Sequence, residues 1–269
     1  MENLNLKAQR DIPGLRRWVN ELLVLLREMM QEPVSYTEED HFGFMALCFL
    51  SKQIEHISSI LILVDNEQGR DAELIARSMI EGLGQLLWAA NDAQRRALRW
   101  RAFAWIHDWR TMNAQNAAGE PVDQNRRAEI NTALAQYGDQ FLTRRARRHR
   151  QTDMPLPSDP YCQNWTGHNY SQILDSVQGQ PLRQKLYKPF SAWHHWSPGG
   201  LGAAIVRDCN GVTFPPPSPA ASATALATGF QCSMQTAELV DSHLGLGFHT
   251  RIADLREGYI TWYETHSGE

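Results

Sequence analysis

Apolar residues recur along this chain with the three- to four-residue spacing of amphipathic helices. This spacing predicts helices over residues 12–30, 37 to about 64, 70–90, 92–114, 123–149, 167–177, 181 to about 195, and 220 to about 244. Thr37 is expected to cap the second helix, because three acidic residues follow it in the first turn. A short C-terminal piece follows the last helix, and only residues 203–206 suggest an extended segment.

Two proline-rich loops interrupt the helices, one over residues 151–165 and one over residues 208–218. We find no sustained alternation of the kind that strands require and no internal repeat. The pattern therefore predicts an all-α fold, a single bundle of about seven helices in one domain over residues 1–269. Its parts are an N-terminal helix (1–36), a helical core (37–149), a loop-rich connection (150–180) and C-terminal helices (181–269).

The composition is that of an ordinary globular chain, with 42% hydrophobic and 21% charged residues among 269. A formal net charge of −4 gives no global reason to bind nucleic acid, although a local patch could still do so. No signal peptide and no apolar run of membrane-spanning length is apparent, which predicts a cytoplasmic protein. The four cysteines form no CxxC pair; three disulfide pairings are open, and free thiols are the plainer interpretation.

The predicted helix over residues 70–90 carries a face that is neither core nor simple solvent. At 100° per residue, and with Arg77 taken as zero, the side chains of Glu81, Gly84 and Trp88 point within about 40° of the direction of Arg77. Arg77 and Glu81 are i,i+4 neighbours, so they can form an ion pair that braces the bundle. The alternative is that both side chains point into a pocket beside Trp88.

A second polar cluster lies at the end of the helix over residues 181–195. Two adjacent histidines, His194 and His195, lie between Trp193 and Trp196. Imidazole acts as a general acid or base near neutral pH, and Ser191 shares a helical face with them. Candidate substrate-binding neighbours are Tyr187, Lys188, Ser191 and Trp193. The alternative is a histidine that stabilises the helix C-terminus through the dipole and stacks on tryptophan.

The strongest basic patch is the run over residues 144–150, which holds five arginines in seven positions. Such a patch can contact phosphate groups, and we name Arg144, Arg147 and His149 as candidate RNA-binding residues. The alternative is a solvated helix end beside the proline-rich loop.

The chain shows no standard nucleotide-binding or hydrolase motif, and no cofactor or metal is expected. A His-Asp dipeptide, His107-Asp108, is of the kind that metal phosphohydrolases use, but such a site needs further ligands. A metal-dependent phosphohydrolase is therefore kept as a third hypothesis, which a bound metal would have to support.

Two short motifs carry a resemblance to known proteins. The segment from Arg77 to Glu81 and the set Tyr187, Ser191 and His194 resemble a family of bacterial helical domains of unknown function, with Arg-Ser-x-x-Glu and Tyr-x-x-x-Ser-x-x-His motifs. The resemblance covers about residues 40–245. The arrangement is also distantly similar to HEPN domains, helical bundles that often dimerise and include ribonuclease toxins and phage-defence effectors. Their signature places Arg four to six residues before a late His, where this chain has Lys188.

The HEPN resemblance implies a metal-independent ribonuclease that acts as a toxin or phage-defence effector. His194 or His195 would be the general acid or base, Arg77 would bind phosphate, and Glu81 would hold Arg77. RNA, a second copy of the chain, and an antitoxin or defence-system protein are the expected partners, and no membrane. The alternative is a non-enzymatic binding module. Its polar crevice, lined by Arg77, Glu81, Trp88 and the His-Trp cluster around His194, would receive a small ligand or a partner segment.

Overall fold

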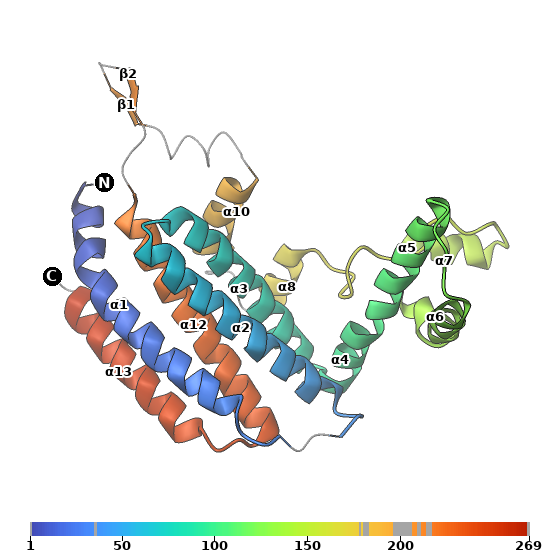
Figure 1. Cartoon of the computed structure of the whole chain (residues 1–269), viewed down its shortest axis with the longest axis horizontal. Coiled ribbons are helices and arrows are strands. Elements are labelled where there is room, and N and C mark those ends of the chain that lie inside the picture. Colours follow the sequence, from blue (N-terminus) through green and yellow to red (C-terminus); the bar gives the residue numbers. More distant parts are fainter. Residues whose placement is uncertain are drawn as a thin grey trace. The chain divides into compact units, whose positions relative to one another are not determined.

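The computed structural model describes residues 2–34, 37–177, 179, 183–195, 206–208, 211–213 and 217–267. Most of these residues are helical, which confirms the all-α prediction (Figure 1). The chain forms two compact units: unit 1 comprises Met1–Trp88 and Tyr170–Glu269, and unit 2 comprises Ala89–Asn169. The interpretation of the chain as one domain stays a prediction, because two compact units can belong to one domain or to two.

Unit 1 contains a bundle of long helices and several shorter elements. The long helices are α1 (Glu2–Met29), α2 (His41–Asp65), α3 (Gly69–Ala90, whose last two residues belong to unit 2), α12 (Pro219–Leu244) and α13 (His249–Ser267). The shorter elements are α8 (Tyr170–Ser176), the π-helical turn η2 (Arg183–Tyr187), α10 (Lys188–His194) and the antiparallel strands β1 (Val206–Asp208) and β2 (Gly211–Thr213).

Helix α12 is the central helix of unit 1 and contacts α1, α2 and α13. Ser218 caps its first turn by accepting a hydrogen bond from the Ala221 amide, and Pro219 follows at a favoured position. Gly245 ends it in the left-handed conformation, with φ of 64°. The neighbouring helices come close because α12 buries mostly small side chains; at Gly229, a Cβ would lie 3.1 Å from Ile60 Cδ1.

Helices α1 and α13 pack through two reciprocal glycine–tryptophan contacts. A Cβ on Gly14 of α1 would lie 2.3 Å from Cζ2 of Trp262 on α13. A Cβ on Gly258 of α13 would lie 2.6 Å from Cη2 of Trp18 on α1. Each indole therefore occupies the space that a side chain on the facing helix would need, and glycine is required at both positions.

Unit 2 contains shorter helices and one long irregular segment. Its elements are α4 (Ala93–Ala102), α5 (Ala104–Ala117), α6 (Gln124–Tyr137), the 3₁₀ turn η1 (Gly138–Phe141) and α7 (Arg144–Gln151). The core includes Phe103 and Phe141, whose rings meet edge to face at 5.2 Å. The irregular segment over residues 152–169 returns to this core and pairs Tyr161 with Leu142 in an isolated β-bridge.

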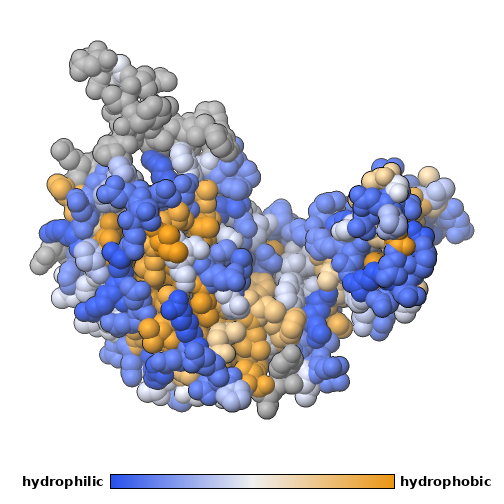
Figure 2. Space-filling model, viewed as in Figure 1, coloured by the Kyte–Doolittle hydropathy of each residue, from blue (hydrophilic) through white to orange (hydrophobic). Residues whose placement is uncertain are grey.

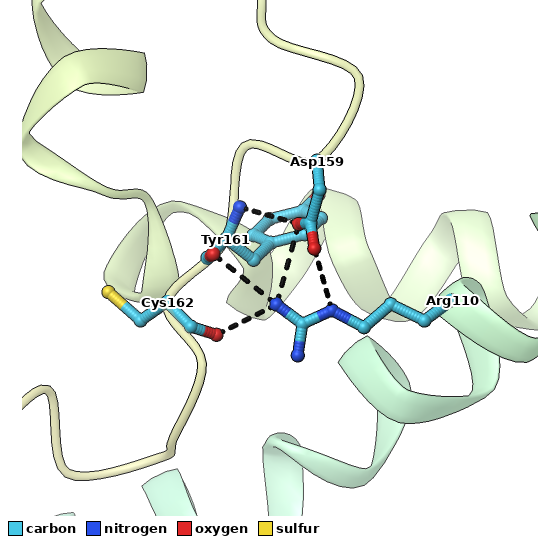
Figure 3. Close-up of polar contacts among 4 residues, drawn as sticks. All are labelled: Arg110, Asp159, Tyr161 and Cys162. Carbon is cyan, nitrogen blue, oxygen red and sulfur yellow. Dashed lines mark hydrogen bonds and ion pairs between the residues drawn. The ribbon is translucent and has the colours of Figure 1, made fainter.

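Arg110 of α5 holds the proline-rich segment in place (Figure 3). Its Nε lies 2.9 Å from Asp159 Oδ2, and its Nη2 donates to the carbonyl oxygens of Tyr161 (3.3 Å) and Cys162 (2.9 Å). The planar guanidinium presents several donors in one fixed fork, so one side chain satisfies a carboxylate and two backbone carbonyls at once. The segment is therefore tied to the helices of unit 2 rather than a free loop.

Several helix boundaries differ from the prediction, and unit 2 accounts for most of them. The predicted helix over 92–114 is divided at Phe103 into α4 and α5, and the one over 123–149 is divided into α6, η1 and α7. These divisions let Phe103 and Phe141 enter the same core, and they raise the number of helices above the expected seven. The C-terminal piece is the long helix α13.

The remaining differences lie in unit 1. Helix α1 extends past the predicted residues 12–30 to Glu2 and passes through Pro13. The cap of α2 is Asp40, not Thr37, because the Asp40 side chain accepts the Gly43 amide at 2.9 Å and also pairs with His243 at 3.0 Å. Residues 167–177 contain only the shorter α8. Residues 203–205 and Trp196 lie outside the described residues.

Among the described residues, α2 is the one helix that is long and apolar enough to cross a membrane by length and composition. No uninterrupted apolar run of that length is present, but the helix reaches the necessary average hydropathy over His41–Asp65. A core helix can pass the same test, and one face of α2 is buried in unit 1, including Met45, Leu50 and Ile57. Figure 2 shows apolar residues on the visible face of unit 1 among hydrophilic ones. Cytoplasmic location stays a prediction.

Replacing glycine by alanine should have opposite effects on stability at Gly14, which contacts Trp262, and at Gly82, which has free space. Gly14→Ala forces a rigid indole to move and should lower the free energy of unfolding by about 1–2 kcal/mol, because overpacking costs about 1–3 kcal/mol and the helix propensity of alanine returns at most about 1 kcal/mol. Gly82→Ala is the matched control, because the nearest atom to its Cβ is 3.6 Å away. It should raise stability by roughly 0.5–1 kcal/mol. Denaturant unfolding measures both, and a stabilising Gly14→Ala would refute the contact.

Candidate functional site

Arg77, Glu81 and Tyr187 form a closed hydrogen-bonded triangle in unit 1. Arg77 Nη2 lies 2.8 Å from Glu81 Oε1 and donates to the Tyr187 hydroxyl at 3.0 Å. The same hydroxyl donates to Glu81 Oε1 at 3.0 Å. The Arg77 and Glu81 side chains are one turn apart on α3, and Tyr187 comes from η2, immediately before α10. The triangle therefore attaches the η2–α10 segment to α3.

The triangle is half-buried, and this changes the character of each group. The side chains of Arg77 and Glu81 are 14% and 28% exposed. The guanidinium also lies over the Tyr187 ring, with Cζ 4.9 Å from the ring centroid, an arrangement that favours a cation. Burial and the nearby Glu81 carboxylate raise the pKa of Tyr187, so its hydroxyl keeps its proton and continues to donate near neutral pH.

Arg77 uses only one of its three nitrogens in the triangle, and its Nη1 makes no hydrogen bond among the described residues. Its Nη2 is shared between Glu81 and Tyr187, and its Nε is buried with no hydrogen-bond partner among the described residues. A buried unsatisfied donor lowers the free energy of unfolding, so the unpaired Nε is a cost of holding Arg77 in this position. The Arg77–Glu81 ion pair is thus present, as the interpretation of a brace requires, and the interpretation of both side chains as a pocket wall stays a prediction.

Tyr170, which the sequence analysis did not single out, supports the triangle from α8. Its hydroxyl donates to the Ile80 carbonyl at 2.6 Å, and its ring lies 5.0 Å from that of Tyr187. Gly84 makes this approach possible, because a Cβ there would lie 2.9 Å from the Tyr170 hydroxyl oxygen. Gly84, on the same face of α3 as Arg77 and Glu81, therefore leaves the space in which the side chain of Tyr170 packs.

The histidines of α10 do not reach the triangle in the described contacts. His194 and His195 are exposed, and their rings lie edge to face at 4.8 Å from each other. Ser191 is half-buried and Lys188 is exposed. Among the described residues, Tyr187 and not a histidine contacts Arg77 and Glu81. The roles assigned to His194, His195, Ser191 and Lys188 stay predictions.

The tryptophans beside the two predicted polar clusters, Trp88 and Trp193, lie at different heights along α3. Trp193 is half-buried under Arg70, whose Cζ is 5.1 Å from the indole centroid, near the start of the helix. Trp88 is buried seven residues beyond Glu81, which is about 10 Å along the helix axis. A single site that used both tryptophans would have to extend over most of α3.

Helix α7 in unit 2 presents the predicted basic patch to solvent. Arg144, Arg145, Arg147 and Arg148 are exposed, and Thr143 caps the helix by accepting the Ala146 amide at 3.1 Å. Arg150 pairs with Asp139, and Arg147 donates to the Gln140 carbonyl at 3.2 Å. His149 is half-buried, and its Nδ1 lies 2.7 Å from the Pro155 carbonyl oxygen. The ring donates this hydrogen bond in the tautomer that carries a proton on Nδ1.

The candidate metal dipeptide is engaged in packing and ion pairing. The His107 ring meets Phe103 edge to face at 4.9 Å, and Asp108 pairs with Arg126 at 2.5 Å. Among the described residues, no three or more of His, Cys, Asp and Glu form a group that could hold a metal ion.

A model of DUF5677, a family of unknown function, matches residues 43–212. The chain belongs to this family. The predicted membership in a family of unknown function is thereby confirmed, although the match ends before the expected residue 245. Comparison with curated proteins and with solved structures gave no match. The HEPN-like relationship stays a prediction.

The DUF5677 match divides unit 1 unevenly. It contains the triangle, α10 and all of unit 2, but it leaves out α1, α12 and α13. The three helices that enclose much of the unit 1 core are therefore outside the matched region.

Glu73, which lies within the DUF5677 match, is an ionisable group that the sequence analysis missed. It lies four residues before Arg77 and three after Arg70, so it shares the face of α3 that meets Tyr187 and Trp193. Burial raises the pKa of the Glu73 carboxyl to about 7, and the Arg70 charge opposes this only partly. Extending the angular analysis back by one turn from Arg77 would have found it.

The raised pKa of Glu73 predicts a loss of stability as the pH rises. The folded chain holds the Glu73 proton up to about pH 7, while an unfolded glutamate has its ordinary value of 4.5. Between these values the folded state binds more protons, so the free energy of unfolding falls as the pH increases. Relative to wild type, Glu73→Gln should gain stability on going from pH 5 to pH 8, by up to about 3 kcal/mol.

Urea unfolding at both pH values measures this difference. Glu257→Gln on α13 is the matched control, because Glu257 is exposed in the same unit, and it should follow the wild-type profile. An identical pH dependence of Glu73→Gln and wild type would contradict the assignment.

Proposed function

We propose that the protein binds RNA through helix α7 of unit 2. The observation that supports this proposal is the exposure of Arg144, Arg145 and Arg148, which have no carboxylate partner among the described residues. Phosphate contacts made by arginines supply much of the affinity of nucleic-acid-binding proteins. An exposed helix with several uncompensated guanidinium groups has the chemistry that such contacts need.

The distribution of charge supports the proposal. Unit 2 contains twelve arginines and no lysine against eight acidic residues, a formal charge of +4, within a chain of −4. The remainder of the chain therefore carries −8. Figure 2 shows that the visible surface of unit 2 is mostly hydrophilic. The negative net charge of the whole chain therefore does not argue against nucleic-acid binding by unit 2, because the negative charge of unit 1 outweighs the positive charge of unit 2 in the sum.

A half-exposed aromatic group in the same unit favours single-stranded RNA over a duplex. Trp105 is half-exposed, with the Arg126 guanidinium 4.9 Å from its ring centroid. Unpaired bases stack on such side chains, while stacked duplex bases cannot reach them.

Charge reversal on α7 tests the proposal. The double variant Arg145→Glu/Arg148→Glu should weaken binding of a 20-nucleotide single-stranded RNA at least tenfold, measured by fluorescence anisotropy. The slope of log affinity against log salt should fall in magnitude by about 1.4, since each lost phosphate contact on a single strand removes about 0.7.

The control is Arg10→Glu/Arg27→Glu, which makes the same charge change at two exposed positions of α1. It should retain the wild-type affinity. An equal loss in both variants would reduce the effect to net charge, and binding of duplex DNA in preference to RNA would overturn the choice of ligand.

A metal-independent ribonuclease is the second candidate function. The observation that favours it is the exposed pair His194 and His195 on the helix that Tyr187 attaches to α3. RNA cleavage needs a base for the 2′-hydroxyl and stabilisation of the phosphate charge, and no metal. This candidate includes the HEPN-like relationship, a homodimer, a role as toxin or phage-defence effector, and an antitoxin or defence-system protein as partner.

Cleavage of labelled RNA in the presence of a chelator separates the two candidates. The ribonuclease candidate expects cleavage by wild type and its loss in His194→Ala/His195→Ala, with RNA binding by α7 unchanged. Lys52→Ala, an exposed cation on α2, is the control and should cleave normally. RNA binding without cleavage by wild type would leave the non-enzymatic binding module as the function.

A further inference from the structure

A large groove in unit 1 lies between α1, α12, α13 and η2, apart from the triangle and from unit 2. It has a volume of about 900 Å³. Small-molecule sites occupy about 300–1,000 Å³ and combine an apolar lining with a few polar groups. Most of its lining lies outside the DUF5677 match, so the proposed function of α7 does not account for it.

The floor of the groove is an apolar face of α12. Ala220, Ala223 and Ala227 follow one another at helical spacing, and their short side chains leave the volume open. Thr224 lies between them, and its hydroxyl donates to the Ala220 carbonyl at 2.7 Å within the same helix. The hydroxyl is thus satisfied without a ligand. From Ala220 to Gln231 the floor is about 16 Å long, which suits an extended hydrocarbon chain.

One wall of the groove is aromatic. Trp262 and Tyr263 of α13 both line it, and Tyr263 is 54% exposed. Trp262 is held by its contact with Gly14 on one side and by the His266 ring, 5.1 Å away, on another. Covering this aromatic surface with an apolar ligand would be favourable at roughly 25 cal/mol per Å².

The rim of the groove is more basic than acidic, against the trend of unit 1. It carries Lys7, Lys185 and His266, with Asp11 as the opposing charge. Lys185 is exposed and forms no ion pair with any described carboxylate. A ligand with an apolar body and an anionic end would complement the Lys185 ammonium, while a cationic end would be repelled by it.

We propose that this groove binds one soluble molecule of an amphipathic carboxylate of medium chain length. Its hydrocarbon chain lies on the alanine floor against Trp262, and its carboxylate pairs with Lys185. The site is independent of RNA binding, because it belongs to unit 1 and uses no residue of α7.

Calorimetric titration of the full chain with sodium dodecanoate, below its micelle concentration, tests the proposal. Dodecanoate should bind at one molecule per chain, and dodecyltrimethylammonium at least tenfold more weakly. Lys185→Glu should weaken dodecanoate binding at least tenfold, and Ala227→Trp, which fills the floor, should abolish it. Arg10→Glu, an exposed cation of α1 outside the groove, should bind as wild type does.

Three results would overturn the proposal. They are the absence of saturable binding to wild type, equal binding of the two amphiphiles, and unchanged binding in Lys185→Glu. Lys185 is exposed, so this variant keeps its fold and remains decisive even where Ala227→Trp unfolds, which circular dichroism detects. Binding to phosphatidylglycerol vesicles without binding of dodecanoate would replace the soluble ligand by a membrane surface.

Discussion

Unit 1 depends on the requirement that α12 be enclosed by other helices. A helix in contact with α1, α2 and α13 can approach all three only where its side chains are small, and α12 buries alanine, serine, threonine and glycine along much of its length. At Gly229 the distance to Ile60 leaves little room for even one methyl group. The small side chains of α12 have a second result. Where no other helix packs on α12, its alanines are too short to fill the space, and a groove remains.

The triangle applies a different constraint, because it uses charge instead of apolar contact to attach a segment. Arg77 and Glu81 compensate each other on α3, and Tyr187 satisfies both by donating to one and accepting from the other. Removing one member of such a half-buried network leaves the others unsatisfied, which costs more than the lost bond itself. The exposed histidines of α10 are thereby carried on a fixed support, even though they make no described contact with it.

The sequence predicts best what is encoded locally. The helices over residues 70–90 and 220–244 agree with α3 and α12 to about one residue, because their caps and apolar stripes lie within the segments themselves. The division at Phe103 depends on a contact with Phe141, thirty-eight residues away, and no local signal announces it. The i,i+4 spacing predicted the Arg77–Glu81 pair, but the choice of Tyr187 over His194 as its partner depends on long-range docking of η2.

The uses of arginine within unit 2 distinguish its structural cations from its available ones. Arg99 and Arg110 donate to backbone carbonyls of the irregular segment, so their charges serve the fold. Burial lowers the pKa of Arg99, which marks the cost of holding it there. The exposed arginines Arg144, Arg145 and Arg148 on α7 perform no such task in the described structure. A cation that neither supports the fold nor pairs with a carboxylate breaks no hydrogen bond or ion pair of the protein when it binds a phosphate. This difference directs the RNA proposal to α7 and not to Arg99 and Arg110.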